Sequence, residues 1–358
     1  MPTTHPEFNE KTEALDVAKA FADQIRGRTV LVTGVNRGGI GFTTAQAFAS
    51  QSPAHLIFAG RTPAKLEECI GLIKAEYPDV DYRALQIDLS SQKSVRAAAA
   101  ELLSWADVPA IDIVVNSAGV MGTPERTLTA EGIELHMATN HVGHFLLTCL
   151  IAAKLVAAAG RRGGARAVNV TSASPTVAVM RWSDPRFETR NADLPAAEQP
   201  RYEMLELFGN AGPRERAYVP VEAYNQSKVA NVLFSVGANA RLLARHGVLS
   251  LAVHPGVIPT ELGRDFTPAN TAALEAMRAS GFLAFKTLGA GAATSLVAAL
   301  DPALGPPDAA PRDGRENHGV YLADCQISDK AQPLAVSSAE AERLWKASEE
   351  MVQQKFEW

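Results

Sequence analysis

A short apolar run that passes directly into a glycine-rich turn is the feature that most limits the folds open to this chain. Residues 29–33 read Thr-Val-Leu-Val-Thr, and the next eight residues contain four glycines. A helix of small residues is then expected over 42–49. A β-branched run of this kind is typical of a buried parallel strand. Strand, glycine turn and helix in succession are the context of a dinucleotide-binding fingerprint, although a plain structural turn is the alternative.

The glycines of this turn have separate tasks in such a fingerprint. The first permits a tight turn, a later one lets the backbone approach a pyrophosphate, and the last lets the helix pack on the strand. The N-terminus of the helix then faces the phosphates. We therefore expect the turn to contact the phosphates of a dinucleotide through Gly34, Asn36, Arg37, Gly38, Gly39, Ile40 and Gly41.

Short apolar runs alternate with helical segments along most of the chain. This alternation predicts an α/β fold, with a single doubly wound (Rossmann) parallel sheet of about seven strands and helices on both faces. A long insertion precedes the helix that carries Tyr224, and a C-terminal extension follows the last strand. The expected strands are 29–33, 55–59, 83–87, 111–115, 166–170, 249–253 and 319–322.

Polar or small residues follow nearly every expected strand. Ligands of doubly wound sheets bind beyond the carboxyl ends of the strands, so these residues should meet at one edge. Ala118 and Gly119 are small enough for the backbone to lie against a flat ligand. Asp88 can reach the adenine end of a cofactor or, equally well, cap the next helix. The residues expected at this edge are Arg61, Asp88, Leu89, Asn116, Ala118, Gly119, Ser172, Pro255, Gly256 and Thr260.

Two arginines near the glycine turn favour NADP over NAD. A NAD site usually has Asp or Glu after the second strand to bind the ribose 2′-hydroxyl, whereas an arginine accommodates a 2′-phosphate. Here that strand is followed by Arg61, and Arg37 lies within the turn. A guanidinium matches the geometry of a phosphate. The alternative is that both arginines are solvated surface residues.

Tyr224 and Lys228 are spaced to lie on one face of a helix, one turn apart. A free phenol has a pKa of about 10. An ammonium held ~4 Å away stabilises the phenolate by about 4 kcal/mol at an effective dielectric of ~20. The pair is therefore expected to lower the pKa of Tyr224 towards the working pH of an acid/base, although a solvated helix face is the common explanation of this spacing. Asn140, in a helix expected over 133–159, is either a structural bridge or part of a polar relay.

Composition narrows the classes of partner and the compartment. The 358 residues carry a net charge of -5, which disfavours nucleic acid or an anionic membrane as the main partner. The three cysteines show no metal-ligand spacing and no disulfide framework, so we expect no metal and a cytoplasmic setting. No secretory signal is apparent. The most apolar run, 145–159, is too short to span a bilayer and contains Lys154.

We divide the chain into an N-terminal helical arm over 1–28 and a Rossmann-fold dinucleotide-binding and catalytic domain over 29–358. A polar helix is expected at 7–26, with Leu15, Ala18 and Ala22 in a thin apolar stripe and Val17, Phe21 and Ile25 beside it. Within the domain, 175–222 is a long irregular insertion rich in proline and glycine, and such loops tend to be functional or disordered. The segment 261–316 is expected to cover the substrate.

Taken together and in order, these motifs resemble the short-chain dehydrogenase/reductase family. The resemblance covers about 29–260. Within the family, the sequences around 141–145 and 223–231 resemble the branch of retinol dehydrogenases and WW-domain oxidoreductases, and the tail is similar to its fungal members. The motifs are Thr33-Gly34 with the turn to Gly41, Asp88, Asn116-Ser-Ala-Gly119, Asn140, Thr171-Ser172, Tyr224-x-x-x-Lys228, and Pro255-Gly256 with Thr260.

The resemblance implies a role for each catalytic residue. Tyr224 would be the general acid/base, and Lys228 would lower its pKa and hold the nicotinamide ribose. Ser172 would hydrogen-bond the substrate oxygen, and Asn140 would join a water relay that returns protons through Lys228. Thr260 and the backbone near Ile258 would touch the nicotinamide amide. Family members are mostly dimers or tetramers, so a homodimer or homotetramer is expected.

Two departures from the family pattern affect this interpretation. Gly38 fits the usual count from Gly34, but Gly39-Ile-Gly41 is the local match, so either Gly38 or Gly39 could approach the phosphate. Ser172 and Tyr224 lie 224 − 172 = 52 residues apart, because the insertion separates them. We expect this insertion to shape the substrate pocket; a surface decoration away from the site is the alternative.

The sequence therefore predicts an NADP(H)-dependent oxidoreductase acting on a carbonyl or alcohol. A non-catalytic NADP(H)-binding sensor or scaffold is the alternative, and a sugar-nucleotide epimerase is a third interpretation that Arg61 disfavours. The aromatic residues of the insertion and of 261–285 suggest a fairly apolar small-molecule substrate, although they could be ordinary core. These residues are Trp182, Phe187, Tyr202, Phe208, Phe266, Phe282 and Phe285.

Overall fold

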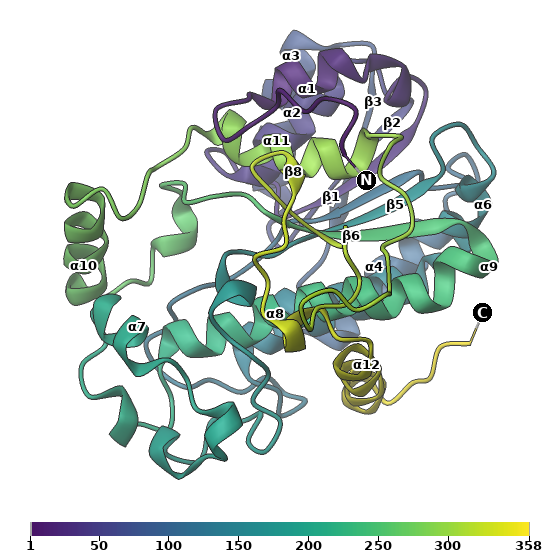
Figure 1. Cartoon of the computed structure of the whole chain (residues 1–358). Coiled ribbons are helices and arrows are strands. Elements are labelled where there is room, and N and C mark those ends of the chain that lie inside the picture. The colour runs from purple at the N-terminus through teal and green to yellow at the C-terminus, as the bar shows by residue number, and fades with distance from the viewer. Residues whose placement is uncertain (1, 358) are drawn as a thin grey trace.

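A computed structural model describes residues 2–357, and its centre is one eight-stranded sheet (Figure 1). The strand order is β3-β2-β1-β4-β5-β6-β7-β8, and every neighbouring pair is parallel except the antiparallel β7–β8 pair. The expected doubly wound sheet is confirmed. The strands are β1 Thr29–Thr33, β2 His55–Gly60, β3 Asp81–Gln86, β4 Ile113–Asn116, β5 Ala165–Val170, β6 Val248–His254, β7 Tyr321–Ala323 and β8 Gln326–Ile327.

The two-residue strand β8 was not expected. It follows a tight turn in which Asp324 and Cys325 both adopt left-handed backbone conformations. A strand of two residues is too short to show an alternating pattern in the sequence, so only the structure shows it. The third, fourth and last parallel strands also start or end one to two residues away from their expected limits.

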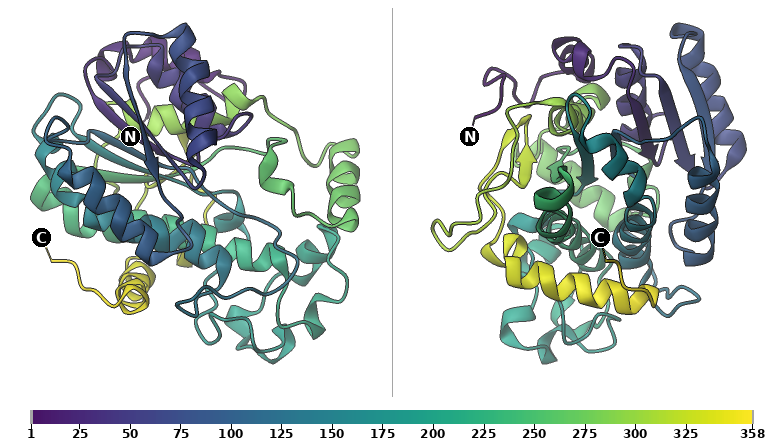
Figure 2. Two further views of the ribbon diagram at one scale, coloured as in Figure 1. Left: turned by 180° about the vertical axis from the view of Figure 1, so that it is seen from behind. Right: turned by 90° about the vertical axis from the view of Figure 1, so that its right-hand side faces the viewer.

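Helices cover both faces of the sheet, as Figure 2 shows. Side chains alternate along each strand, so Leu31 packs with the helices of one face and Val30 and Val32 with those of the other. One face is covered by α4 Gln92–Ser104, α5 Gly143–Leu150, α6 Ala152–Ala159 and α8 Pro220–Ala238. The other is covered by α1 Ala14–Ala20, α2 Ile40–Ala49, α3 Pro63–Glu76 and α11 Leu288–Leu300.

The N-terminal helix is shorter and more deeply packed than the apolar stripe predicted. It comprises α1 and a 3-10 turn, Ala22–Gln24, instead of one helix over 7–26. Val17, Ala18 and Ile25 are buried in the core that α11 and α2 share. Leu15, which we expected in the stripe, is 49% exposed. The buried face therefore includes Ala18 of the expected stripe and the residues expected beside it, but not Leu15.

The helix expected over 133–159 is broken into three parts. A π-helical segment, Met137–Val142, precedes α5, and α6 follows α5 after Ile151. The axis bends by 61° between Met137–Leu150 and Ala152–Ala159. No single helix within 2–357 is long and apolar enough to cross a membrane; this bent pair meets the criteria by length and composition only, and most of its side chains are buried in the protein.

The insertion 175–222 is mostly irregular and lies below the N-terminal end of α8 in Figure 1. It contains one short helix, α7 Tyr202–Leu207, and 3-10 turns at Asn191–Asp193, Ala196–Glu198 and Pro213–Glu215. Helix α10, Pro268–Ala279, projects beside it. The remaining helices are α9 Ala244–His246 and α12 Ser338–Val352, with 3-10 turns at Ser174–Thr176, Glu261–Gly263 and Pro333–Val336 and a π-helical segment at Asn239–Leu243.

Candidate active site

The glycine turn after β1 has the shape of a phosphate cradle. Gly34 has a φ of +73°, and a Cβ atom there would lie 2.6 Å from the Ala118 Cα atom. A Cβ atom on Gly41 would lie 2.6 Å from the Gly34 carbonyl oxygen, so helix α2 packs directly on the turn. These two positions therefore require glycine for steric reasons.

Gly38 and Gly39 differ in what they require. Gly38 has a φ of +74° and has open space where a Cβ atom would stand, whereas Gly39 is the N-cap of α2 with ordinary extended backbone. A Cβ atom on Gly39 would lie 3.1 Å from the Asn36 carbonyl oxygen. Ile40 then begins α2, so its N–H group belongs to the unpaired first turn of the helix.

The two arginines expected to bind a 2′-phosphate are solvent-exposed. Arg37 is 73% exposed, and its guanidinium lies 3.7 Å from the Glu68 carboxylate, a distance typical of a weak surface pair. Arg61 is exposed directly after β2. Both side chains can therefore move to meet an anion.

Asp88 and Leu89 mainly build the turn after β3. The Asp88 carboxylate accepts hydrogen bonds from the Ser90 N–H at 2.9 Å and the Ser90 hydroxyl at 2.7 Å. The N-cap of α4 is Ser91, so Asp88 closes the turn that leads to the cap. Leu89 is buried, and its carbonyl lies against Gly143 at the start of α5.

The loop after β4 reaches the centre of the edge, but the Asn116 side chain does not. Asn116 is buried and donates to the Asn169 side chain at 2.8 Å. By contrast, a Cβ atom on Gly119 would lie 3.7 Å from the Lys228 ammonium, and the Ala118 N–H donates to the Thr33 hydroxyl at 3.0 Å. The small residues therefore form the edge, while Asn116 joins β4 to β5 beneath it.

The loop after β6 follows the same edge. Gly256 has a φ of +91° and packs against the stem of Lys286. Ile258 packs against Gly291 of α11, and the Thr260 hydroxyl accepts the Leu262 N–H at 3.3 Å. Thr260 thus caps the 3-10 turn that follows and is oriented by it. Pro255 links this loop to the end of β6, at His254.

Tyr224 and Lys228 lie on one face of α8 and are almost completely buried, at 6% and 3% exposed. The Lys228 ammonium is 5.6 Å from the centre of the Tyr224 ring and donates a hydrogen bond to the Val170 carbonyl at 2.9 Å. Burial lowers the pKa of Lys228 to about 7. Burial also raises the pKa of Tyr224 to about 12, and the nearby Ser172 hydroxyl acts in the opposite direction.

The sign of the Tyr224 shift corrects our expectation for the protein alone. We expected the ammonium to lower the pKa of the phenol. Instead, burial disfavours the charged form of both groups, and the Lys228 ammonium donates its hydrogen bond to the Val170 carbonyl at the end of β5. In this structure Tyr224 is therefore a protonated phenol across the physiological range.

Ser172 and Asn140 lie beside the Tyr224–Lys228 pair. The Ser172 hydroxyl donates to the Ser174 hydroxyl at 2.7 Å, and its carbonyl accepts from the Tyr321 hydroxyl at 2.9 Å. The Asn140 side-chain oxygen accepts the Val120 N–H, and its amide nitrogen donates to the Val120 carbonyl and, at 2.9 Å, to the Ser227 hydroxyl. Its side chain therefore forms a structural bridge; the water relay stays a prediction.

Sequence reasoning missed a second set of polar residues around this site. Thr33 accepts two N–H groups of the loop after β4, so its hydroxyl donates to His144 at 2.8 Å, and His144 donates to the Asn140 carbonyl at 3.0 Å. Ser174, Asn225 and Glu222 extend a hydrogen-bonded chain from Ser172. Only the proximity of Asn225 and Glu222 to Tyr224 in the sequence could have indicated them.

The insertion and the segment after β6 touch each other near this end of α8. The Asn270 side chain of α10 donates to the Phe208 carbonyl at 2.7 Å, and Tyr218 donates to the Thr123 carbonyl at 2.7 Å. Gly122 packs against the Phe266 ring. Phe187, in contrast, is buried within the insertion, 4.6 Å from the Arg181 guanidinium.

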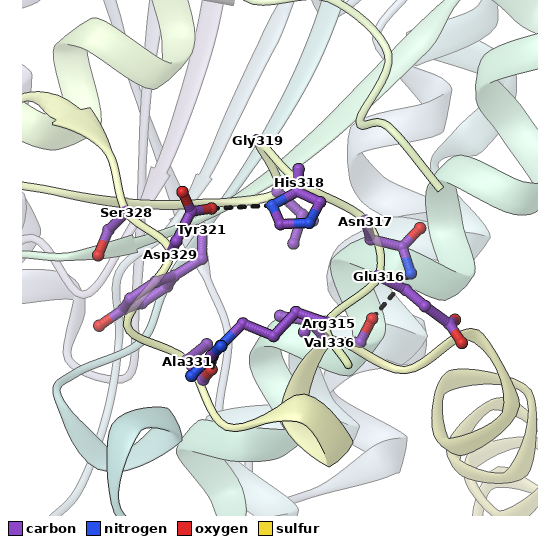
Figure 3. A pocket seen from close by; sticks show the side chains of 11 residues that line it. Arg315, Glu316, Asn317, His318, Gly319, Tyr321, Ser328, Asp329, Ala331 and Val336 are labelled. Carbon is purple, nitrogen blue, oxygen red and sulfur yellow. Dashed lines mark hydrogen bonds and ion pairs between the residues drawn. The ribbon is translucent and has the colours of Figure 1, made fainter. Parts of the chain in front are cut away.

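Away from this edge, the described part of the chain holds scattered candidate metal ligands and a small pocket. Across 2–357, no group of three or more His, Cys, Asp or Glu side chains is placed to hold a metal ion. The pocket in Figure 3, between Arg315, His318 and Tyr321, has room for about one water molecule. His318 in that pocket pairs with Asp329 at 2.9 Å, as the dashed line shows.

Comparison with known proteins shows which family this chain resembles. A model of the short chain dehydrogenase family matches residues 28–184, and so ends within the insertion. An oxidoreductase, fscI, of Fusarium equiseti is 40% identical over 70% of this chain and 94% of the relative. Retinol dehydrogenase 12 of Homo sapiens is 34% identical over 92% of this chain and 87% of the relative. WW domain-containing oxidoreductase of Pongo abelii is 32% identical over 99% of this chain and 75% of the relative.

Solved structures share the fold at lower identity. A crystal structure of an uncharacterized protein from Mycobacterium paratuberculosis aligns with a TM-score of 0.60 at 24% identity, over 94% of this chain and 98% of that one. The Pseudomonas aeruginosa RhlG/NADP complex aligns with a TM-score of 0.56 at 23% identity, over 78% and 91%. From its curated relatives, the chain belongs to the short-chain dehydrogenase/reductase family of oxidoreductases, in the branch that contains the retinol dehydrogenases and the WW domain-containing oxidoreductase.

Proposed function

We propose that this protein transfers a hydride between NADP(H) and the carbonyl or alcohol group of a fairly apolar small molecule, with Tyr224 as general acid/base. The observation that carries the proposal is the position of the buried Tyr224–Lys228 pair. It lies against Ser172 and Gly119, at the edge where the glycine turn also lies. An acid/base and a cofactor cradle at one edge are what hydride transfer needs.

The residues at the edge fit a dinucleotide. Gly34 and Gly41 let the turn pack closely on the loop after β4 and on α2, and the first N–H groups of α2 would then face the phosphates of a dinucleotide. Arg37 and Arg61 are exposed cations beside the turn, which supports NADP over NAD. NADP(H), when bound, supplies or accepts the hydride.

Each residue of the centre has a task in the proposed reaction. Tyr224 holds its proton at neutral pH and donates it to the oxygen of a carbonyl as that oxygen gains charge. Lys228, once protonated, offers a positive charge below the phenol ring. Ser172 contributes a hydrogen bond to the same oxygen.

The test of this proposal is Tyr224→Phe. The variant keeps the ring packing but removes the proton donor, so it should bind NADPH with unchanged affinity and lose turnover of a test ketone by several orders of magnitude. NADPH binding is read from cofactor fluorescence and turnover from the loss of NADPH absorbance. Retained turnover would show that Tyr224 is not the acid.

The apolar substrate class rests on the segment after β6. Phe282 is 59% exposed and Phe285 is partly exposed, whereas Phe187 packs within the insertion and Trp182 packs against Arg343 of α12. We propose that this segment and the insertion together cover the substrate. A homodimer or homotetramer and a cytoplasmic location stay predictions, to be tested by analytical ultracentrifugation and by imaging of the tagged protein in cells.

A further inference from the structure

A chain of hydrogen bonds leads from Ser172 to a buried carboxyl group that the proposed reaction does not use. The Ser172 hydroxyl donates to Ser174 at 2.7 Å, and the Ser174 hydroxyl donates to the Asn225 carbonyl oxygen, Oδ1, at 2.7 Å. The Asn225 amide nitrogen donates to the Glu222 carboxylate at 3.1 Å. Glu222 lies in the first turn of α8 and is buried.

At the Glu222 end of this chain, the hydrogen bond from Gln226 has a fixed donor, because the backbone of the insertion holds the Gln226 side chain in one orientation. The Arg181 N–H donates to the Gln226 side-chain oxygen at 2.5 Å, and the Gln226 amide nitrogen donates to the Val179 carbonyl at 2.7 Å. The second hydrogen of that nitrogen is therefore directed at one oxygen of Glu222, 2.8 Å away. This oxygen is always an acceptor.

The other oxygen of Glu222 can change its role. As a carboxylate it accepts from the Asn225 nitrogen, which leaves the Asn225 oxygen facing Ser174. The Asn225 oxygen then accepts from the Ser174 hydroxyl, and the Ser174 hydroxyl accepts from the Ser172 hydroxyl. The hydrogen of Ser172 is then used within the chain. As a carboxylic acid this oxygen would donate to Asn225, the amide would turn over, and each hydroxyl would reverse. The hydrogen of Ser172 would then be free for the Tyr224 oxygen or the substrate.

We propose that Glu222 is a positioning residue, whose proton decides through Asn225 and Ser174 whether Ser172 donates a hydrogen bond to the reacting oxygen. The proposal rests on the proposed function of Ser172 and Tyr224. The proton of Glu222 exchanges with solvent, and none crosses the Asn225 amide, which only turns. Glu222 touches neither substrate nor cofactor.

The surroundings of Glu222 support a change of state near neutral pH. Burial raises the pKa of its carboxyl to about 7, although the hydrogen bonds from Asn225 and Gln226 act in the opposite direction. From the insertion, the charged group that faces it is Arg181, whose guanidinium is paired with Asp184 at 2.6 Å. On α8 the neighbouring titratable groups are Tyr224 and Lys228, and across 2–357 no ionisable side chain hydrogen-bonds to the carboxyl.

The Glu222→Gln variant tests the proposal because its geometry mimics the protonated state. The fixed nitrogen of Gln226 requires the oxygen of the new amide, so the new nitrogen must donate to Asn225. Ser172 would then be a donor at every pH. The turnover rate of the wild type should fall as the pH rises through about 7. The variant should lack this step and should exceed the wild type about tenfold at pH 9, the effect of one hydrogen bond to a charged oxygen.

Two further variants separate this effect from a structural one. Ser174→Ala interrupts the chain of hydrogen bonds, so it should also remove the fall in turnover that Glu222 causes near pH 7. Adding Glu222→Gln to Ser174→Ala should cause no further change. Glu206→Gln, an exposed carboxyl in the same insertion, should keep the wild-type profile. The titration of Lys228, which falls in the same range, is common to all of them, so the Glu222 step is read from the ratio of variant to wild-type turnover at each pH. A Glu222→Gln profile shaped like the wild type, or lower at every pH, would overturn the proposal.

A second measurement does not need turnover. A hydrogen bond from Ser172 lowers the pKa of Tyr224, so Glu222→Gln should lower it by about one unit. The titration is followed by ultraviolet difference absorbance. The titration curve of Tyr224→Phe is subtracted to remove the contribution of the other five tyrosines. A lowered pKa in a protein that reduces no carbonyl would refute the proposed function but support the chain reversal. An unchanged pKa would refute the reversal whatever the turnover.

Discussion

The glycine turn and the Tyr224 centre lie at the same edge of one sheet but are built in opposite ways. The turn presents backbone and exposed guanidinium groups, and Gly38 faces open space. The centre consists of side chains that are almost completely removed from water. The turn therefore depends on shape and is insensitive to pH, whereas the centre depends on what burial does to protonation. The following predictions test this contrast.

The largest expected effect is that of Gly34→Ala. A Cβ atom there would meet the backbone of Ala118 at 2.6 Å, in a left-handed conformation that alanine disfavours. The change should destabilise the protein by several kcal/mol and abolish NADPH binding, as measured by thermal unfolding and fluorescence titration. Gly27→Ala is the matched control: it has the same φ of +73° but open space, so only about 1–2 kcal/mol of backbone strain is expected. Equal losses would show that the close approach to Ala118 is unimportant.

Lys228→Met should stabilise the cofactor-free protein while it abolishes turnover. Burial lowers the pKa of Lys228 to about 7, so the unfolded chain binds a proton that the folded one releases between about pH 7 and 10. Wild-type stability should therefore rise with pH across this window. The advantage of the variant should be a few kcal/mol below pH 7 and should shrink towards pH 10.

The measurement for Lys228→Met is the melting temperature at several pH values, without cofactor. Lys93→Met, an exposed position of α4, serves as the control and should shift stability little at any pH. If the difference between Lys228→Met and the wild type were constant with pH, the lysine would not be titrating in the folded state.

Arg61→Asp tests the exposed guanidinium groups beside the glycine turn. Loss of a guanidinium from a 2′-phosphate should reduce kcat/KM with NADPH by ten- to a hundredfold, and the loss with NADH should be much smaller. Arg162→Asp, on the far side of the molecule near the N-terminal helix, should leave kcat/KM unchanged with both cofactors. Equal losses with both cofactors would contradict a role of Arg61 in phosphate recognition.

The smallest effect is expected at Phe282→Ser. Because the ring is 59% exposed, its loss should change the unfolding free energy by less than about 0.5 kcal/mol. If the segment after β6 covers an apolar substrate, KM should nevertheless rise a few-fold for an apolar ketone and stay constant for a small polar one. Constant KM values for both would place the substrate elsewhere.

The sheet and the residues at its edge could be predicted because each signal is local. A buried parallel strand must be a continuous apolar run, and the residue after it is marked by a change to glycine or a polar side chain, as at Gly34 and Ser172. What depends on distant neighbours could not be predicted. The Asn116 side chain is turned inward by partners on β5 and α5, and the chain from Ser172 to Glu222 closes only when the insertion folds back on α8.

The sign of the Tyr224 pKa shift shows the same limit. A spacing of four residues shows that Lys228 is near, but not that both groups are buried and that the ammonium binds the Val170 carbonyl. Similarly, the helical period placed Leu15 in one stripe with Ala18, whereas the docking of α1 on α11 buries Ala18 and Val17 and leaves Leu15 exposed. Tertiary packing decides both outcomes.

Helix α12 lies along the outer side of α8, and this placement restricts how copies of the chain can associate (Figure 2). The Trp345 ring fits over Gly237, where a Cβ atom would be 3.0 Å away, and lies 5.0 Å from the Phe145 ring. Two subunits that joined α8 to α8 would first have to peel away this C-terminal helix and expose an indole to water. The cover that α12 forms over α8 therefore disfavours direct pairing of two α8 helices.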